Sequence, residues 1–180
     1  MRIGILTGGG DCPGLNAAIR AIVRRAAQYN YEVVGIKNGW AGLMGEAELM
    51  PLTAKSVAGI LPLGGTILGT SRTNPFQRDP QVDVALENLQ FSPSGAQPLI
   101  EQLEAYQAAY VQRHTQQVLD NIKRNGLDAL IVLGGKDTLS VAEQFHRLGV
   151  PVVGLPKTMD NDLPETDYCI GFDSAVTRLM

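Results

Sequence analysis

The sequence has few of the features that mark disulfide-stabilised or membrane-spanning proteins. Its two cysteines, Cys12 and Cys169, are too few and too widely separated for a disulfide framework or a zinc motif, and we expect both to be small packed residues. No apolar run approaches the ~20 residues that cross a bilayer, and the first residues lack a signal-peptide profile. We therefore expect a cytoplasmic protein without a membrane partner.

Positive charge is also scarce. The 180 residues contain 15 Lys and Arg against 18 Asp and Glu, with a formal charge of -3 and a pI near 5.3. No basic cluster follows one face, so we expect no nucleic-acid partner. The chain has instead a 44 % hydrophobic fraction and 20 glycines, a globular composition whose length fits one domain with a real core.

The chain opens with a strand, a glycine loop and a helix. Residues 3–6 form a short apolar run, residues 7–14 contain four glycines, and apolar residues then recur at helical spacing from Leu15 to Ala27. Such a loop at a helix N-terminus suits an anion, although a plain tight turn is an equal alternative. The spacing matches neither the dinucleotide fingerprint nor a Walker A loop.

The next hundred residues give weaker signals. We expect a strand at 32–36, a glycine loop at 38–43 that carries Trp40, and a short helix at 53–61. Core packing is the first interpretation of Trp40, with ligand stacking second. Further along, we expect a loop at 88–98 and one long helix through 103–122, with His114 packed or half-exposed on it.

The third quarter repeats the opening pattern. A strand at 127–133 leads into Gly134, Gly135, Lys136, Asp137 and Thr138, followed by a helix at 139–148. A strand at 150–155 leads into the polar loop 156–162, which is a solvated turn or a site. A short strand at 168–172 then precedes a helix that opens at Asp173. Because parallel strands end at one sheet edge, we expect these loops to form a ligand site in an α/β fold.

Five motifs in this order resemble the 6-phosphofructokinase family. They lie at 7–18, 64–72, 134–138, 156–162 and 166–172, and the resemblance covers the chain except about 81–113. It implies a three-layer α/β/α fold with a mostly parallel sheet. It also implies transfer of a phosphoryl group from ATP or pyrophosphate to O1 of fructose 6-phosphate, with Mg²⁺ as cofactor and a homo-oligomeric assembly.

The resemblance assigns roles to single residues. Asp160 resembles the proton acceptor, with Lys157 and Thr158 beside it, and Thr158, Met159 and Asp162 belong to the sugar site. The donor phosphates would contact a larger set: Gly9, Gly10, Arg72, Gly134, Gly135, Lys136, Asp137 and Thr138. Asp137 with Lys157 resembles the pyrophosphate-dependent branch, because a carboxylate there would exclude the α-phosphate of ATP by charge and volume.

Three departures from the family qualify this interpretation. Lys136 stands where the family has a carboxylate ligand of Mg²⁺, and a protonated lysine has no lone pair for the ion. Three interpretations are open: other carboxylates and the phosphates hold the ion, Lys136 itself supplies the positive charge, or the metal site is degenerate. Family members are about twice as long, so we expect a truncated chain (1–180) without the carboxyl-terminal sugar phosphate domain. Residues 81–113 form an insertion suited to a subunit contact.

The alternative function is a non-catalytic phosphate- or nucleotide-binding regulatory fragment.

Overall fold

The computed structural model describes residues 1–90 and 96–179, and its centre is a six-stranded sheet. The strand order is β3-β2-β1-β4-β5-β6, and every neighbouring pair is parallel except β2 and β3. The strands are β1 (Arg2–Thr7), β2 (Glu32–Ile36), β3 (Leu49–Leu52), β4 (Ala129–Gly134), β5 (Val152–Thr158) and β6 (Ile170–Gly171).

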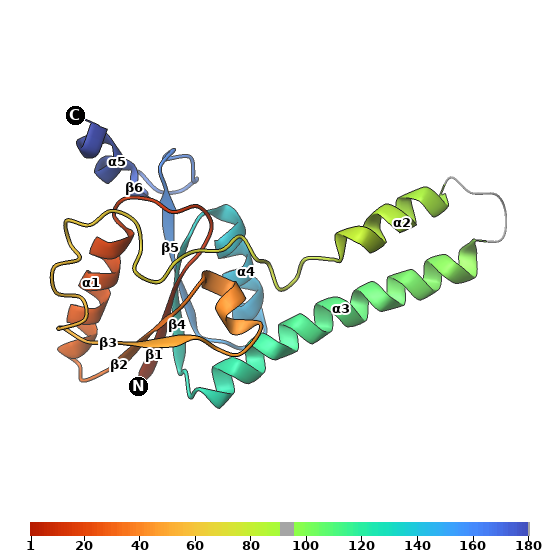
Figure 1. Cartoon of the computed structure of the whole chain (residues 1–180), viewed down its shortest axis with the longest axis horizontal. Helices are drawn as coiled ribbons and strands as arrows, with labels where there is room; N and C mark the ends of the chain where they lie inside the picture. The colour runs from red at the N-terminus through yellow and green to blue at the C-terminus, as the bar shows by residue number, and fades with distance from the viewer. Residues whose placement is uncertain (91–95, 180) are drawn as a thin grey trace.

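Helices cover both faces of this sheet (Figure 1). Helix α1 (Leu15–Ala27) packs on one face, where Leu15, Ile19 and Val23 join Ile5 of β1 in one apolar cluster. Helix α4 (Lys136–Arg147) and the 3₁₀ helix η1 (Gly39–Leu43) lie on the other, and Trp40 packs against Phe145 there. The expected three-layer α/β/α fold with a mostly parallel sheet is confirmed.

The strong sequence signals correspond to observed elements. Strands β1 and β4 lie in the middle of the sheet, where Ile5, Leu6 and Leu133 have no exposed surface. Because both faces of these strands are buried, their sequences are short continuous apolar runs. Helix α1 has the predicted bounds. Trp40 is 1 % exposed and belongs to the core, and both cysteines are free and buried, as expected.

Helices α2 (Pro80–Gln90) and α3 (Gln97–Arg124) form a hairpin that extends away from the sheet (Figure 1). The predicted long helix is present, but α2 was missed. The loop expected at 88–98 is wrong at both ends, since residues 88–90 belong to α2 and residues 97–98 begin α3. Its middle, 91–95, lies outside the described residues.

Other boundaries differ from prediction for local reasons. The helix expected at 53–61 is wrong: the segment consists of turns, and Thr53 and Ser56 at its start satisfy each other's backbone amides with their side-chain hydroxyls. The loop expected at 38–43 contains η1. Strand β3 was missed; it is a short antiparallel edge strand with Pro51 in it, which carries little strand signal.

Two further boundaries bear on the site. Strand β5 continues through Thr158, because Lys157 and Thr158 pair with β6. Helix α4 begins at Lys136, so the polar residues expected in a loop occupy its first turn. Helix α5 (Phe172–Leu179) follows β6. Within the described residues, no helix is both long enough and apolar enough to span a bilayer.

The hairpin is fixed to the body by Asn121 of α3. This side chain is 4 % exposed, and its amide donates to the carbonyl oxygens of Leu43 at 2.9 Å and Gly45 at 2.7 Å. A buried acceptor that loses its partner costs about 1–3 kcal/mol.

We expect Asn121→Ala to lower the free energy of unfolding by about 1–3 kcal/mol in urea titration, because two carbonyl groups lose their donor. Gln117→Ala, an exposed position on the same helix, is the matched control and should change stability by less than about 0.5 kcal/mol. Equal stability of the two variants would contradict the role of Asn121 in fixing the hairpin to the body.

Candidate functional site

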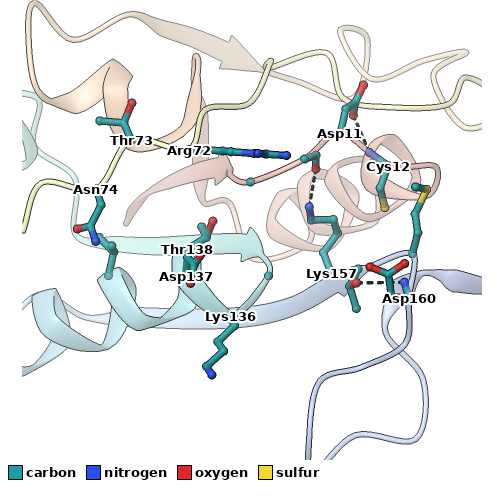
Figure 2. A pocket seen from close by; sticks show the side chains of 16 residues that line it. Asp11, Cys12, Arg72, Thr73, Asn74, Lys136, Asp137, Thr138, Lys157 and Asp160 are labelled. Carbon is teal, nitrogen blue, oxygen red and sulfur yellow. Dashed lines mark hydrogen bonds between the residues drawn. The ribbon is translucent and has the colours of Figure 1, made fainter. Parts of the chain in front are cut away.

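The carboxyl ends of β1, β4 and β5 open onto one pocket of about 460 Å³ (Figure 2). Its walls come from the loop after β1, the first turn of α4, the end of β5 and the segment around Arg72. The lining residues are Gly9, Gly10, Asp11, Cys12, Arg72, Thr73, Asn74, Gly135, Lys136, Asp137, Thr138, Val141, Lys157, Thr158, Met159 and Asp160.

The pocket brings together nearly all of the residues singled out in the sequence. From the donor-phosphate set only Gly134 is missing, because it is the last residue of β4 and is buried beneath the pocket. From the sugar set only Asp162 lies outside, although its carboxylate accepts a hydrogen bond from the Thr158 hydroxyl at 3.1 Å.

The glycine loop after β1 is held by its own backbone. Gly8 donates its N–H to the Leu133 carbonyl at 2.9 Å, and Gly9 donates to the Ser71 carbonyl at 2.8 Å. These two amides therefore fix the loop to β4 and to the Arg72 segment instead of facing a phosphate. Gly9 has a φ of 80°, a left-handed conformation that favours glycine.

Close packing on Thr138 sets the distance between the glycine loop and α4. A Cβ atom at Gly8 would lie 2.6 Å from the Thr138 side chain, and one at Gly134 would lie 2.4 Å from it. The indole N–H of Trp40 donates to the Thr138 carbonyl at 3.3 Å. The N-terminus of α4, with its partial positive charge, is thereby positioned at the pocket.

Lys157 is the most buried charged side chain of the pocket. It is 4 % exposed, and its Nζ donates to the Gly10 carbonyl at 2.5 Å. This bond joins β5 to the glycine loop across the pocket (Figure 2). A buried ammonium is costly unless it is paired.

Burial and neighbouring charges act on Lys157 and Cys12 in opposite directions. Burial lowers the pKa of Lys157 below its ordinary 10.5, while Cys12 and Asp11 partly oppose that change. Burial raises the pKa of the Cys12 thiol above its ordinary 9.0; Lys157 opposes this and Asp11 adds to it. Cys12 therefore remains a protonated thiol at neutral pH.

Three cations at the pocket lack a carboxylate partner among the described residues. The ion pairs of that part of the chain involve Arg2, Arg78 and Arg147, and none involves Arg72, Lys136 or Lys157. Figure 2 shows Arg72 reaching across the pocket, whereas the exposed Lys136 side chain points away from both other cations. Arg72 and Lys157, with the helix N-terminus, form a surface suited to an anion.

The loop after β5 presents Asp160 on the same wall as Lys157, across the pocket from Arg72 (Figure 2). The Asp160 amide donates to the Thr158 hydroxyl at 3.1 Å, which forms a local turn. Asn161, at a φ of 52°, holds the far side of the loop, since its side chain bonds the backbone of Asp167 and Cys169. The Asp160 carboxylate has no hydrogen bond or ion pair within the described residues, so it is free to accept a proton.

Sequence reasoning missed five lining residues. Asp11 and Cys12 directly follow Gly10, and their place in the first motif was the only available signal. Thr73 and Asn74 follow Arg72, and Val141 lies one turn into α4. Nothing in the local pattern separates these residues from a surface turn or a core stripe.

The carboxylates of the pocket do not form a metal centre. Within the described residues, no three His, Cys, Asp or Glu side chains are grouped so that they could hold an ion. Asp11, Asp137 and Asp160 come from three different elements, and protonated Lys136 has no lone pair to offer. The side chains alone therefore do not fit a protein-held Mg²⁺.

Comparison with known proteins gives one family. The phosphofructokinase family model matches residues 2–180. A pyrophosphate–fructose 6-phosphate 1-phosphotransferase of Dictyoglomus thermophilum is 49 % identical over 176 residues, which are 98 % of this chain and 41 % of that protein. An ATP-dependent 6-phosphofructokinase of Aquifex aeolicus is 42 % identical over 177 residues, 98 % of this chain and 44 % of that protein.

A solved structure has the same fold. Pichia pastoris phosphofructokinase in the T-state superposes with a TM-score of 0.71 at 30 % identity, covering 95 % of this chain and 16 % of that one. The chain spans about two fifths of the length of the curated relatives it matches.

The lowered pKa of Lys157 predicts a pH dependence of stability. Between its folded-state pKa and 10.5 the unfolded chain binds more protons than the folded one, so stability rises with pH in that window. We expect the unfolding free energy of the wild type minus that of Lys157→Met to increase as pH rises toward 10.5. Without Lys157 the pKa of the Cys12 thiol rises further, so the variant loses more stability than the wild type as the pH rises through the thiol's range. This effect also increases the difference between the two unfolding free energies.

Denaturant titrations at several pH values measure this difference. Lys136→Met, which removes an exposed lysine at the same pocket, is the control and should give a flatter difference. A difference that shrinks with rising pH would contradict the desolvated environment of Lys157.

Proposed function

The chain belongs to the phosphofructokinase family, and we propose that it is the donor-binding part of a phosphotransferase that phosphorylates O1 of fructose 6-phosphate, with pyrophosphate as donor. The observation that carries this proposal is one pocket lined by two cations, Arg72 and Lys157, and by the Asp160 carboxylate, none of which has an ion-pair partner among the described residues. Phosphoryl transfer needs this combination: fixed positive charge for the phosphates, and a base for the attacking hydroxyl. Family membership also supports a glycolytic role and a cytoplasmic location.

The proposed reaction proceeds by proton transfer and displacement. Asp160 accepts the proton of the sugar O1 hydroxyl as that oxygen attacks the nearer phosphorus of pyrophosphate. The bond from this phosphorus to the bridging oxygen breaks, and inorganic phosphate leaves. Arg72 and the N-terminus of α4 stabilise the charge on the donor, and Lys157 holds the glycine loop in position beside it.

Pyrophosphate is favoured over ATP by two residues of the pocket. Asp137 is exposed in the first turn of α4, where its negative charge opposes the additional phosphate of a nucleotide. Lys157 adds a buried positive charge beside the glycine loop. Relatives of this chain include both pyrophosphate-dependent and ATP-dependent proteins, so ATP is the second candidate donor.

We expect Asp160→Asn to lower kcat by about 10²- to 10⁴-fold, because the base is lost while the shape of the loop is kept. A coupled assay for fructose 1,6-bisphosphate measures this, on the chain extended with the carboxyl-terminal part of a relative. Asp167→Asn, in the same segment but outside the pocket, should keep wild-type turnover. Near-normal kcat in Asp160→Asn would exclude the assigned role.

The donor preference is tested at Asp137. We expect the wild type to turn over faster with pyrophosphate than with ATP, and Asp137→Ala to shift the ratio of the two kcat/KM values toward ATP, since a like charge is removed. Glu143→Ala, on the same helix and paired with Arg147, is the control and should leave the ratio unchanged. A wild type that prefers ATP would reverse the donor assignment and leave the acceptor assignment standing.

A further inference from the structure

The Arg72 segment, residues 63–72, has no regular secondary structure of its own. It consists of turns and irregular backbone, with neither helix nor strand. Arg72 at its end nevertheless reaches across the pocket (Figure 2). Contacts with the rest of the molecule must therefore fix the course of this segment.

The first half of the segment is held by Asn16, in the first turn of α1. This side chain is 2 % exposed. Its amide donates to the carbonyl oxygens of Leu63 at 3.3 Å and Gly64 at 3.2 Å, and its oxygen accepts the Ile67 N–H at 2.8 Å. The backbone N–H of Asn16 donates to the Gly65 carbonyl at 2.9 Å. Helix α1 thus anchors this half of the segment.

The half nearest to Arg72 is held by Thr7, the last residue of β1. Thr7 has no exposed surface. Its hydroxyl donates to the Gly69 carbonyl at 2.7 Å and lies 3.0 Å from the Thr66 hydroxyl. Because the single hydroxyl hydrogen of Thr7 is used for Gly69, Thr66 is the donor of the second bond. Two bonds at one buried side chain therefore fix the segment three residues before Arg72.

Close packing keeps the end of β1 and the segment together. Gly39 lies between them with a φ of 59°, and a Cβ atom there would be 2.9 Å from the Thr7 carbonyl oxygen and 3.2 Å from the Ser71 hydroxyl oxygen. The Ser71 carbonyl accepts the Gly9 N–H at 2.8 Å. The residue before Arg72 is thus held between Gly39 and the glycine loop.

A buried hydroxyl at Thr7 is not needed to fill space. Valine has nearly the same shape and suits a strand at least as well. Thr7 is also not among the residues that line the pocket, so its hydroxyl does not contact a ligand there. What the hydroxyl provides is its two bonds to the Arg72 segment.

We propose that Thr7 is a positioning residue for the donor site and acts through Arg72. Its hydroxyl holds Gly69 and Thr66, and thereby sets where the Arg72 guanidinium meets the phosphate. A displaced guanidinium loses the directional N–H···O bonds that it makes with phosphate oxygens. The inference rests on the proposed function, because it takes Arg72 as a contact of the donor.

Binding of inorganic pyrophosphate to the 180-residue chain, measured by calorimetric titration, tests this role. Thr7→Val keeps the shape and removes the hydroxyl, whereas Thr7→Ser keeps the hydroxyl and removes the methyl group. We expect Thr7→Val to raise the dissociation constant about threefold to tenfold, and Thr7→Ser to raise it less than about twofold. A role in packing alone would give the opposite order.

A double-mutant cycle with Arg72 shows whether Thr7 acts through it. We expect Arg72→Met alone to raise the dissociation constant about tenfold or more, because a charge-assisted contact is lost. Thr7→Val combined with Arg72→Met should bind like Arg72→Met alone, since no guanidinium remains to be positioned. Independent, multiplicative losses in the double variant would contradict action through Arg72.

Two further variants separate positioning from lost stability. Asn121→Ala removes buried hydrogen bonds of α3 outside the pocket, and it should leave pyrophosphate binding unchanged. Thr66→Val removes the other hydroxyl of the pair at a less buried position, and it should weaken binding in the same direction as Thr7→Val. Circular dichroism selects the variants that are folded, so Thr66→Val decides the question if Thr7→Val does not fold.

The outcomes distinguish this inference from the proposed function. If Arg72→Met weakens binding and neither threonine-to-valine variant does, the positioning role is excluded while the donor site stands. If the wild type does not bind pyrophosphate, or Arg72→Met binds it as the wild type does, the donor assignment fails and the positioning role fails with it. Weaker binding in Thr7→Val, near-normal binding in Thr7→Ser and no added loss in the double variant support the role.

Discussion

The hydrogen bond from the Lys157 ammonium to the Gly10 carbonyl is the interaction on which the pocket depends. It joins the end of β5 to the loop after β1, across the opening between them. The glycine loop is also bonded to β4 and to the Arg72 segment through the amides of Gly8 and Gly9. Four segments that are far apart in the sequence are thus fixed to one another, which holds the pocket in shape.

The same lysine explains the electrostatic character of the site. It is buried with a carbonyl as its hydrogen-bond partner and forms no ion pair with the residues that the structure describes, and burial lowers its pKa. An anion in the pocket would supply the missing charge. The close packing of Gly8 and Gly134 on Thr138 places the N-terminus of α4 beside it, so the helix dipole acts on the same space.

The sequence by itself determined the α/β alternation, the bounds of α1 and β2, and most of the residues that line the pocket. These features follow from the spacing of the apolar residues and from the order of strands, glycine loops and helices along the chain, because both are local signals in the sequence. It gave no sign of α2 or β3, and it placed a helix at 53–61, where the hydroxyls of Thr53 and Ser56 form turns. Only the tertiary structure decided which amides and cations face the pocket. Gly9 uses its amide for the Ser71 carbonyl, Lys157 bonds Gly10, and Lys136 turns away, because these contacts join residues that packing, not sequence proximity, brings together.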